Sequence, residues 1–233
     1  MKYQQYLRLV LFDIDGTLIT TDGIAKRTFA EVLENALGHG RVALDYDFAG
    51  KTDLRIYREI MQASNISQEG LEQRREEFFD VFFHLLEQRL NHDNVTVLPG
   101  VRLLLDALER EEAATLALLT GNMIRGAKIK LTPPALLRYF SFGAFGNDAE
   151  QRHELAEIAK ARAYDKTGVV FKAKDIIIIG DTPHDIDCGK HLNVRSIAVA
   201  TGGFTHDDLA SHRPDYLFDD LADTDRVLDA IFA

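Results

Sequence analysis

Residues 8–18 read RLVLFDIDGTL, an apolar run that ends at two aspartates one residue apart, followed by glycine. The run 8–12 has the length and apolar character of a buried strand. Because side chains alternate along a strand, Asp13 and Asp15 should point the same way at its carboxyl end. Two such carboxylates repel each other unless a cation or a proton compensates them. The stretch therefore predicts a ligand site, although taken alone it also suits a turn with two solvated acids.

Similar apolar runs recur along the chain, with amphipathic patterns of helical spacing between them. The expected strands lie at 8–12, 115–119, 140–145, 175–179, 195–200 and 215–218. Helices are expected at 101–112 and 153–163, where apolar residues form one stripe. Several of the strands are apolar on both faces, as in a parallel sheet that is covered on both sides. The alternation predicts an α/β protein with a Rossmann-like, doubly wound parallel sheet.

Residues 19–94 interrupt this alternation, because they contain no convincing strand run. Apolar residues at helical spacing occur there instead, at 29–37, 54–61 and 71–90. The stretch 19–94, called the insert below, is therefore predicted to be an all-helical cap domain. Residues 1–18 and 95–233 would form the catalytic core. A helical layer within a single domain is the alternative.

A second acidic motif, GDTPHD at 180–185, follows the strand expected at 175–179. Ligands of open α/β sheets bind at the carboxyl ends of the strands, so Asp181 should lie near Asp13 and Asp15. Pro183 suits the first turn of a helix and would bring Asp185 to the same crevice. Carboxylate oxygens clustered in this way are the ligands that Mg²⁺ accepts.

A third polar motif, Thr120-Gly121-Asn122, follows the strand expected at 115–119. A hydroxyl and backbone N–H groups at a strand end, close to a helix start, can hold phosphate oxygens. Three polar motifs that each close an apolar strand predict one composite site at a single edge of the sheet.

These motifs together resemble the haloacid dehalogenase-like hydrolase superfamily, and within it the helical-cap phosphatases similar to phosphoglycolate phosphatases and β-phosphoglucomutases. The resemblance covers nearly the whole chain: DIDGTL at 13–18, TGN at 120–122, GDTPHD at 180–185 and the helical insert. The motif set is specific for the superfamily and says little about the substrate.

The resemblance implies a role for each acid. Asp13 is expected to be the nucleophile that forms an aspartyl-phosphate, and Asp15 the general acid–base. Asp13, Asp15, Asp181 and Asp185 are expected to form the Mg²⁺ site, with Asp15 contributing its main-chain carbonyl. Thr120, with Gly121 and Asn122, would bind the phosphoryl group.

One expected part departs from the family pattern. The family places a basic residue, commonly Lys followed by Pro, before the helix that follows the third strand. Here 146–155 reads GNDAEQRHEL, with neither residue. Arg152 is the expected substitute, since a guanidinium can bind phosphate oxygens with two donors. Lys160 is the second candidate, and a surface ion pair of Arg152 with a neighbouring glutamate is the alternative.

The acid at position 15 favours phosphoryl transfer over carbon–halogen hydrolysis, because the dehalogenases of the superfamily lack an acid there. The resemblance thus implies a Mg²⁺-dependent phosphatase that acts on a small phosphorylated metabolite. A phosphoglucomutase-like transferase, which would protect the phosphoenzyme from water, is the second hypothesis. A non-catalytic binding module on the same fold is the third.

The insert contains Gly50-Lys51-Thr52, which looks like the end of a P-loop. A P-loop would require glycine where Asp45 stands and an apolar strand before it, so this interpretation is rejected. Lys51, Thr52 or Asp53 is instead expected to approach the substrate from the insert. Thr52 or Asp53 also suits the N-cap of the helix that begins at Leu54.

Composition bounds the remaining possibilities. The 233 residues carry a formal net charge of −10, which argues against a nucleic-acid partner held by phosphate neutralisation. The single cysteine, Cys188, excludes an internal disulfide and a multi-cysteine zinc site. No targeting segment or membrane-spanning run is visible. A cytoplasmic monomer or homodimer that binds neither membrane nor nucleic acid is expected.

Overall fold

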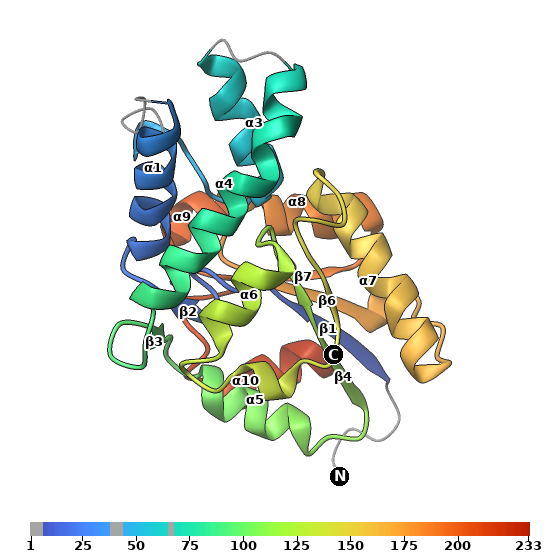
Figure 1. The fold of residues 1–233 in the computed structure, drawn as a ribbon. Coiled ribbons are helices and arrows are strands. Elements are labelled where there is room, and N and C mark those ends of the chain that lie inside the picture. The colour runs from blue at the N-terminus through green and yellow to red at the C-terminus, as the bar shows by residue number, and fades with distance from the viewer. Residues whose placement is uncertain (1–6, 38–43, 65–67) are drawn as a thin grey trace.

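The core of the fold is a parallel sheet with the strand order β5-β4-β1-β6-β7-β8 (Figure 1). The computed structural model describes residues 7–37, 44–64 and 68–233. The strands of this sheet are β1 (Arg8–Phe12), β4 (Ala114–Leu119), β5 (Gly143–Ala144), β6 (Ile176–Gly180), β7 (Arg195–Val199) and β8 (Tyr216–Phe218). The doubly wound α/β fold expected from the sequence is confirmed.

Helices cover both faces of the sheet, because successive residues of each strand point to opposite sides. The helices after the insert are α5 (Val101–Glu109), α6 (Ile124–Leu131), α7 (Arg152–Thr167), α8 (Pro183–Leu192), α9 (His206–Ser211) and α10 (Thr224–Phe232), with short 3-10 turns η1 (Leu137–Tyr139) and η2 (Ala173–Asp175). Leu9 belongs to the apolar cluster shared with α7 and α8. Val10 belongs to the cluster shared with α5 and α10 on the other face.

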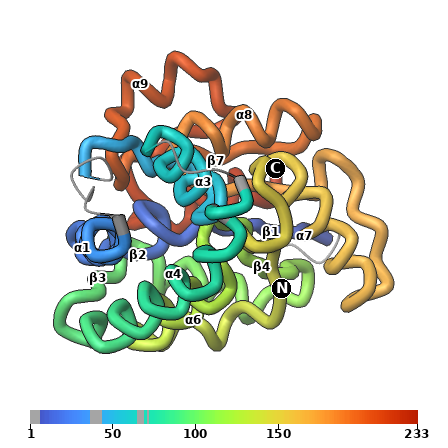
Figure 2. The backbone as a smooth tube through the Cα atoms, turned by 45° about the horizontal axis from the view of Figure 1, so that its top comes forward, coloured from blue at the N-terminus to red at the C-terminus, as the bar shows by residue number. Residues whose placement is uncertain are grey.

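The insert contributes α1 (Ile24–Leu37), α3 (Asp53–Ala63) and α4 (Gln68–Arg89), which stand beyond the carboxyl end of β1 (Figures 1 and 2). Aromatic side chains hold them together: the ring centroid of Phe29 lies 4.8 Å from that of Phe78 and 5.2 Å from that of Phe82. One apolar cluster extends from these rings to the face of the sheet that α5 and α10 cover. The division into a core domain and a cap domain at 19–94 therefore stays a prediction.

Two local expectations were wrong. The insert begins with a short strand, β2 (Ile19–Thr20), which pairs antiparallel with β3 (Thr96–Val97). Two residues are too few to produce a detectable periodicity, so the sequence pattern missed them. Conversely, the strand expected at 140–145 shrinks to β5, because Phe140 closes a 3-10 turn and packs its ring 5.8 Å from that of Phe12.

Within the parts of the chain that the structure describes, no helix combines the length and apolar character needed to cross a membrane.

Candidate active site

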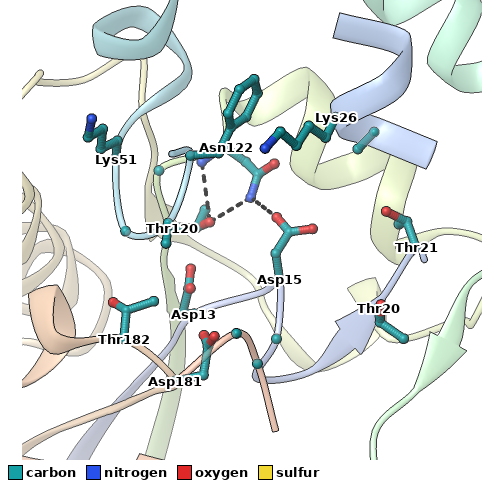
Figure 3. Close-up of a pocket in the computed structure, with 18 of the residues that line it drawn as sticks. Asp13, Asp15, Thr20, Thr21, Lys26, Lys51, Thr120, Asn122, Asp181 and Thr182 are labelled. Atoms are coloured by element: carbon teal, nitrogen blue, oxygen red, sulfur yellow. Dashed lines mark hydrogen bonds between the residues drawn. The ribbon is translucent and has the colours of Figure 1, made fainter. Parts of the chain in front are cut away.

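A cavity of about 580 Å³ opens at the carboxyl ends of β1, β4 and β6 and extends under the insert. Figure 3 shows residues from these strand ends and from the insert around it. The α/β part contributes Asp13, Asp15, Gly16, Thr120, Gly121, Asn122, Lys130, Arg152, Asp181, Thr182 and Gly202, among others. The insert contributes residues that include Lys26, Phe48, Lys51 and Asp53.

Three carboxylates lie close together at this edge of the sheet, and two of them, Asp13 and Asp181, line the cavity, whereas Asp185 lies behind its wall. Asp13, Asp181 and Asp185 each offer one oxygen, and these oxygens lie within 4.8 Å of one another. All three side chains are buried. The backbone N–H of Asp13 donates to the carbonyl of Ile179 at 3.0 Å, so the acid starts where the β1–β6 pairing ends.

Asp181 is enclosed by backbone. Its Oδ1 accepts a hydrogen bond from the Thr17 hydroxyl at 3.1 Å. A Cβ added to Gly202 would lie 1.7 Å from Asp181 Oδ2, and one added to Gly16 would lie 2.3 Å from the same oxygen. Gly16 also has φ +79°, a left-handed conformation that favours glycine. The two glycines thus leave room for the carboxylate to reach the cavity.

Burial and neighbouring charges shift the pKa of two of these acids, Asp13 and Asp181. Burial raises the pKa of Asp13 from 3.8 to about 6, although the charge of Arg152 favours ionisation. Burial and the charge of Asp13 hold the pKa of Asp181 well above its ordinary value. Three buried acids at this spacing need positive charge to be ionised together. Their oxygen donors suit a hard divalent cation, so this group could hold one.

Arg152, the first residue of α7, supplies one such charge. Its Nη2 lies 2.5 Å from Asp185 Oδ1, 3.2 Å from Asp13 Oδ1 and 3.3 Å from the carbonyl of Leu119. The Nε atom is buried and has no hydrogen-bond partner among the described residues. The structure therefore brings Arg152 to the acids, while Lys160 pairs with Glu157 on the surface at 3.5 Å.

Asp185 is held from two sides. Its Oδ2 accepts hydrogen bonds from the backbone N–H and the hydroxyl of Thr182, at 3.1 and 2.6 Å. The bond from the Thr182 backbone N–H belongs to the capping box of α8, in which Asp185 is the third helical residue, and Pro183 stands in the first turn as the sequence predicts. With Arg152 on Oδ1, both oxygens have protein partners. Asp185 thus lies beside Arg152 and the other two acids in an orientation that the start of α8 fixes.

The second aspartate of the first motif has a different environment. Asp15 does not belong to the group formed by Asp13, Asp181 and Asp185. Its Oδ2 accepts from Asn122 Nδ2 at 2.7 Å (Figure 3). Its Oδ1 and Oδ2 lie 2.8 and 2.6 Å from Lys130 Nζ. Its side chain remains 43% exposed. The metal role expected for the Asp15 main-chain carbonyl stays a prediction.

The Thr120-Gly121-Asn122 motif links the sheet to Asp15 and to the insert. Thr120 is buried, and its hydroxyl oxygen accepts from the Asn122 side chain at 2.9 Å. The carbonyl of Gly121 accepts from the backbone N–H of Asp53 at 2.8 Å. A Cβ on Gly121 would lie 2.1 Å from the carbonyl oxygen of Lys51, so only glycine allows this close contact.

Lys51 and Thr52 of the insert differ in their placement. Lys51 lines the cavity, and its ammonium donates to the Tyr46 hydroxyl at 2.6 Å and lies 3.3 Å from Glu59. Thr52 is fully buried and is not among the cavity-lining residues. Its oxygen accepts from the Arg55 N–H as the N-cap of α3, and its hydroxyl donates to the Glu150 carbonyl. Of the two N-cap candidates, Thr52 holds that position.

Lys130 is a cavity residue that the sequence analysis missed. It lies on α6, and the buried side of that helix consists of Gly126, Ala127, Lys130 and Leu131. Spacings of three and four residues mark one helix face. A lysine in phase with an apolar stripe was therefore the signal that could have found it.

Known proteins match this chain over most of its length. The family model described as "haloacid dehalogenase-like hydrolase" matches residues 10–199. A phosphoglycolate phosphatase of Vibrio parahaemolyticus is 28% identical over 228 residues, which are 94% of this chain and 95% of that protein. The pyrophosphatase PpaX of Oceanobacillus iheyensis is 25% identical over 229 residues, covering 97% of this chain and 99% of that protein.

Among solved structures, a β-phosphoglucomutase from Clostridium difficile superposes with a TM-score of 0.74 at 16% identity, covering 97% of both chains. At that identity the likeness concerns the fold alone.

Proposed function

Because this chain belongs to the haloacid dehalogenase-like hydrolase family, we propose that it is a Mg²⁺-dependent phosphatase that hydrolyses a small phosphomonoester through an aspartyl-phosphate on Asp13. One observation carries the proposal. Two carboxylates of one motif occupy separate environments, Asp13 among buried acids and Asp15 on Asn122 and Lys130. A nucleophile and an acid–base need such different surroundings. The names of the relatives, phosphoglycolate phosphatase and pyrophosphatase, support the same chemistry.

Asp13 and Asp181 would hold the Mg²⁺ ion, with Asp185 adding negative charge beside them. When bound, the ion would supply the positive charge that allows an anionic carboxylate and an anionic phosphate to approach each other. The fit rests on the chemistry of the donors: carboxylate oxygens of Asp13 and Asp181 line the cavity, and a third, from Asp185, lies within 4.8 Å of them.

In the first chemical step, an oxygen of Asp13 attacks phosphorus and the bond from phosphorus to the ester oxygen breaks. Arg152, which lies 3.2 Å from Asp13, would hold the phosphoryl oxygens together with the Thr120 hydroxyl. Donors placed around these oxygens stabilise the charge that builds up in the transition state.

Asp15 would transfer the protons. It donates one to the departing ester oxygen, and in the second step it removes one from the water that attacks the aspartyl-phosphate. That attack breaks the bond between phosphorus and the Asp13 oxygen and restores the free carboxylate. One residue can serve both steps because the second reverses the direction of proton transfer.

The cavity favours a small anionic substrate. Its volume of about 580 Å³ falls within the range of small-molecule sites. Lys26 and Lys51 of the insert both line the cavity. Figure 3 shows Lys26 extending toward Asn122, whereas the Lys51 ammonium points away from Asp13 and Asp181 and contacts Tyr46 and Glu59. Positive side chains on the insert would attract the phosphate ester, and the insert would act as a cap that excludes water during the reaction.

The test is phosphate release from a panel of small phosphate esters, measured with Mg²⁺ and with EDTA. We expect release in Mg²⁺ without any sugar bisphosphate, and loss of release in EDTA. Turnover that required a sugar bisphosphate would identify a mutase instead. A folded protein that binds Mg²⁺ but releases no phosphate from any ester would contradict the proposed function and favour a binding module.

Gly202 gives a test of the metal site that does not depend on turnover. We expect Gly202→Ala to weaken Mg²⁺ binding about tenfold, because its Cβ would lie 1.7 Å from Asp181 Oδ2 and displace that carboxylate. The measurement is the rise of the melting temperature as Mg²⁺ is titrated.

Gly203→Ala is the matched control, since a Cβ on the next residue would meet nothing within 4 Å. It should bind Mg²⁺ within about twofold of wild type, the scatter expected of a surface substitution. Equal Mg²⁺ affinity in the two variants would show that Asp181 does not bind the ion.

A further inference from the structure

We propose that Lys130 is a positioning residue, which holds the Asp15 carboxylate in the orientation that its two proton transfers require. The inference rests on the proposed function and adds a part to it. Lys130 lies on α6, outside the three motifs that ended the predicted strands. What distinguishes it is the set of atoms around its ammonium group.

Lys130, Asp15 and Asn122 form a closed ring of hydrogen bonds. Lys130 Nζ lies 2.6 Å from Asp15 Oδ2 and 2.8 Å from Asp15 Oδ1. It also donates to Asn122 Oδ1 at 2.6 Å, and Asn122 Nδ2 donates to Asp15 Oδ2 at 2.7 Å. The ring is anchored to Thr120, whose hydroxyl oxygen accepts from Asn122 at 2.9 Å. Rotation of the Asp15 carboxylate would break two contacts with Lys130.

Burial shows that this lysine is not a surface charge that happens to find a partner. Its side chain is 8% exposed, whereas that of Asp15 is 43% exposed. Taking an ammonium group out of water costs several kcal/mol unless strong hydrogen bonds replace its hydration. Lys128, two residues earlier on the same helix, is exposed. The ammonium of Lys130 thus lies inside the site, and the open side of Asp15 is left for the substrate.

Each of the two proposed reacting carboxylates, Asp13 and Asp15, contacts a different buried cationic side chain. Arg152 contacts Asp13 and Asp185, while Lys130 contacts Asp15. Among the described residues, no ion pair joins one set to the other. Removal of Lys130 should therefore disturb Asp15 and leave the position of Asp13 unchanged.

Asp53 extends the Lys130 contacts toward the insert. Burial raises the pKa of Asp53 to about 6, and the nearby Lys130 charge opposes this rise. The Asp53 carboxylate accepts from the backbone N–H of Met123 at 2.8 Å, at the start of α6. The first residue of α3 is thus hydrogen-bonded to the start of α6, the helix that carries Lys130. Helix α6 therefore contacts both the insert, through Asp53, and the acid–base residue Asp15, through Lys130.

The chemistry separates this role from a purely structural one. In the first step the ester oxygen leaves with the bonding electron pair and takes a proton from Asp15. An alkoxide leaving group needs that proton, whereas p-nitrophenolate leaves without it. In the second step the attacking water needs the Asp15 carboxylate in the orientation that Lys130 holds, whichever ester was cleaved. Loss of Lys130 should therefore slow alkyl ester cleavage and every dephosphorylation, but not cleavage of an aryl ester.

The experiment compares Lys130→Met with Lys128→Met on two substrates, phosphoglycolate as an alkyl ester and p-nitrophenyl phosphate as an aryl ester. For Lys130→Met we expect kcat on phosphoglycolate to fall about 100-fold, the usual size of one acid–base contribution, with KM within about twofold. On p-nitrophenyl phosphate the first turnover should keep its wild-type rate, followed by a slow steady state. That pattern is a burst of about one p-nitrophenol per site. Lys128→Met should match wild type on both substrates.

Three outcomes would overturn the inference. An equal loss in the first turnover of both esters would indicate a structural role, and unchanged kinetics would remove any role. A wild-type protein that released phosphate from these two esters, or from any other ester of the panel, would confirm the premise, whereas one that released phosphate from none of them would contradict the proposed function itself, and the inference with it. If Lys130→Met does not fold, Lys130→Arg replaces it. That variant keeps the positive charge but places it differently, so we expect a smaller burst of p-nitrophenol. A Lys130→Arg protein without any burst would contradict the positioning role.

Discussion

Asp13→Asn should abolish phosphate release, lowering kcat by about 10⁴-fold or more, because an amide oxygen cannot form the aspartyl-phosphate. The loss should be the same for good and poor leaving groups, since the attacking atom itself is removed. Steady-state phosphate release and a search for labelled phosphoenzyme, both in Mg²⁺, provide the measurement. Asp93→Asn is the matched control, because that side chain is 96% exposed and is not among the residues that line the cavity. A variant at position 13 with wild-type rates would remove Asp13 as the nucleophile.

The same substitution should leave the fold intact and strengthen it in the absence of metal. Burial raises the pKa of Asp13 to about 6 in the folded protein, above its ordinary 3.8. The protonated Asp13 therefore stabilises the folded state. This contribution to the free energy of unfolding is fully present below pH 3.8 and is lost as the pH rises through 6, where Asp13 ionises in the folded protein. At pH 8 without Mg²⁺, the melting temperature of Asp13→Asn should exceed that of wild type by a few degrees. The gain should shrink toward pH 4. If Asp13→Asn melted below wild type at pH 8, its loss of activity could come from a destabilised fold and would not identify Asp13 as the nucleophile.

Arg152→Ala should damage both stability and activity. Its guanidinium is 7% exposed and contacts Asp13 and Asp185, so its removal leaves buried acids without a cation. Breaking a buried ion pair in this way costs about 3–5 kcal/mol of folding free energy. Loss of a donor to the phosphoryl oxygens should lower kcat by about 10²–10³-fold. Urea unfolding and phosphate release, both measured with saturating Mg²⁺, test the two effects.

Lys160→Ala on the same helix is the control for this substitution. Its side chain is 45% exposed and pairs only with Glu157 in a surface contact at 3.5 Å. Such a pair contributes little to stability, so activity should change by less than about twofold. If Lys160→Ala lost more activity than Arg152→Ala, the phosphate-binding cation would have been assigned to the wrong turn of α7.

Much of the site followed from local sequence pattern. The apolar run before Asp13 indicated a strand, and the same reasoning placed Thr120 and Asp181 at the ends of two others, which are β4 and β6. Parallel strands align their carboxyl ends at one edge of a sheet, so three separate motifs had to converge. Pattern of this kind fails for very short elements, which is why β2 and the true extent of β5 were missed.

The ion pairs of the site were beyond the reach of that reasoning. Lys130 lies 115 residues from Asp15 in the sequence, and its contact depends on where α6 lies once it has packed against α4. Arg152 and Lys160 are both basic residues of α7, and only the packed helix shows which of them turns inward. Helical periodicity predicts which residues share one face of a helix, but it does not predict which residues of other elements that face contacts.

The sequence alone was therefore enough to predict that one cavity is lined by Asp13, Asp15 and Asp181. This was possible because strand alternation is a local property and the alignment of strand ends is a general property of a parallel sheet. The tertiary structure decided which cation stands beside which carboxylate. It paired Arg152 with Asp13 and Lys130 with Asp15. Electrostatic contacts depend on distances through space and on burial, and these arise only when helices distant in the sequence pack on the same sheet.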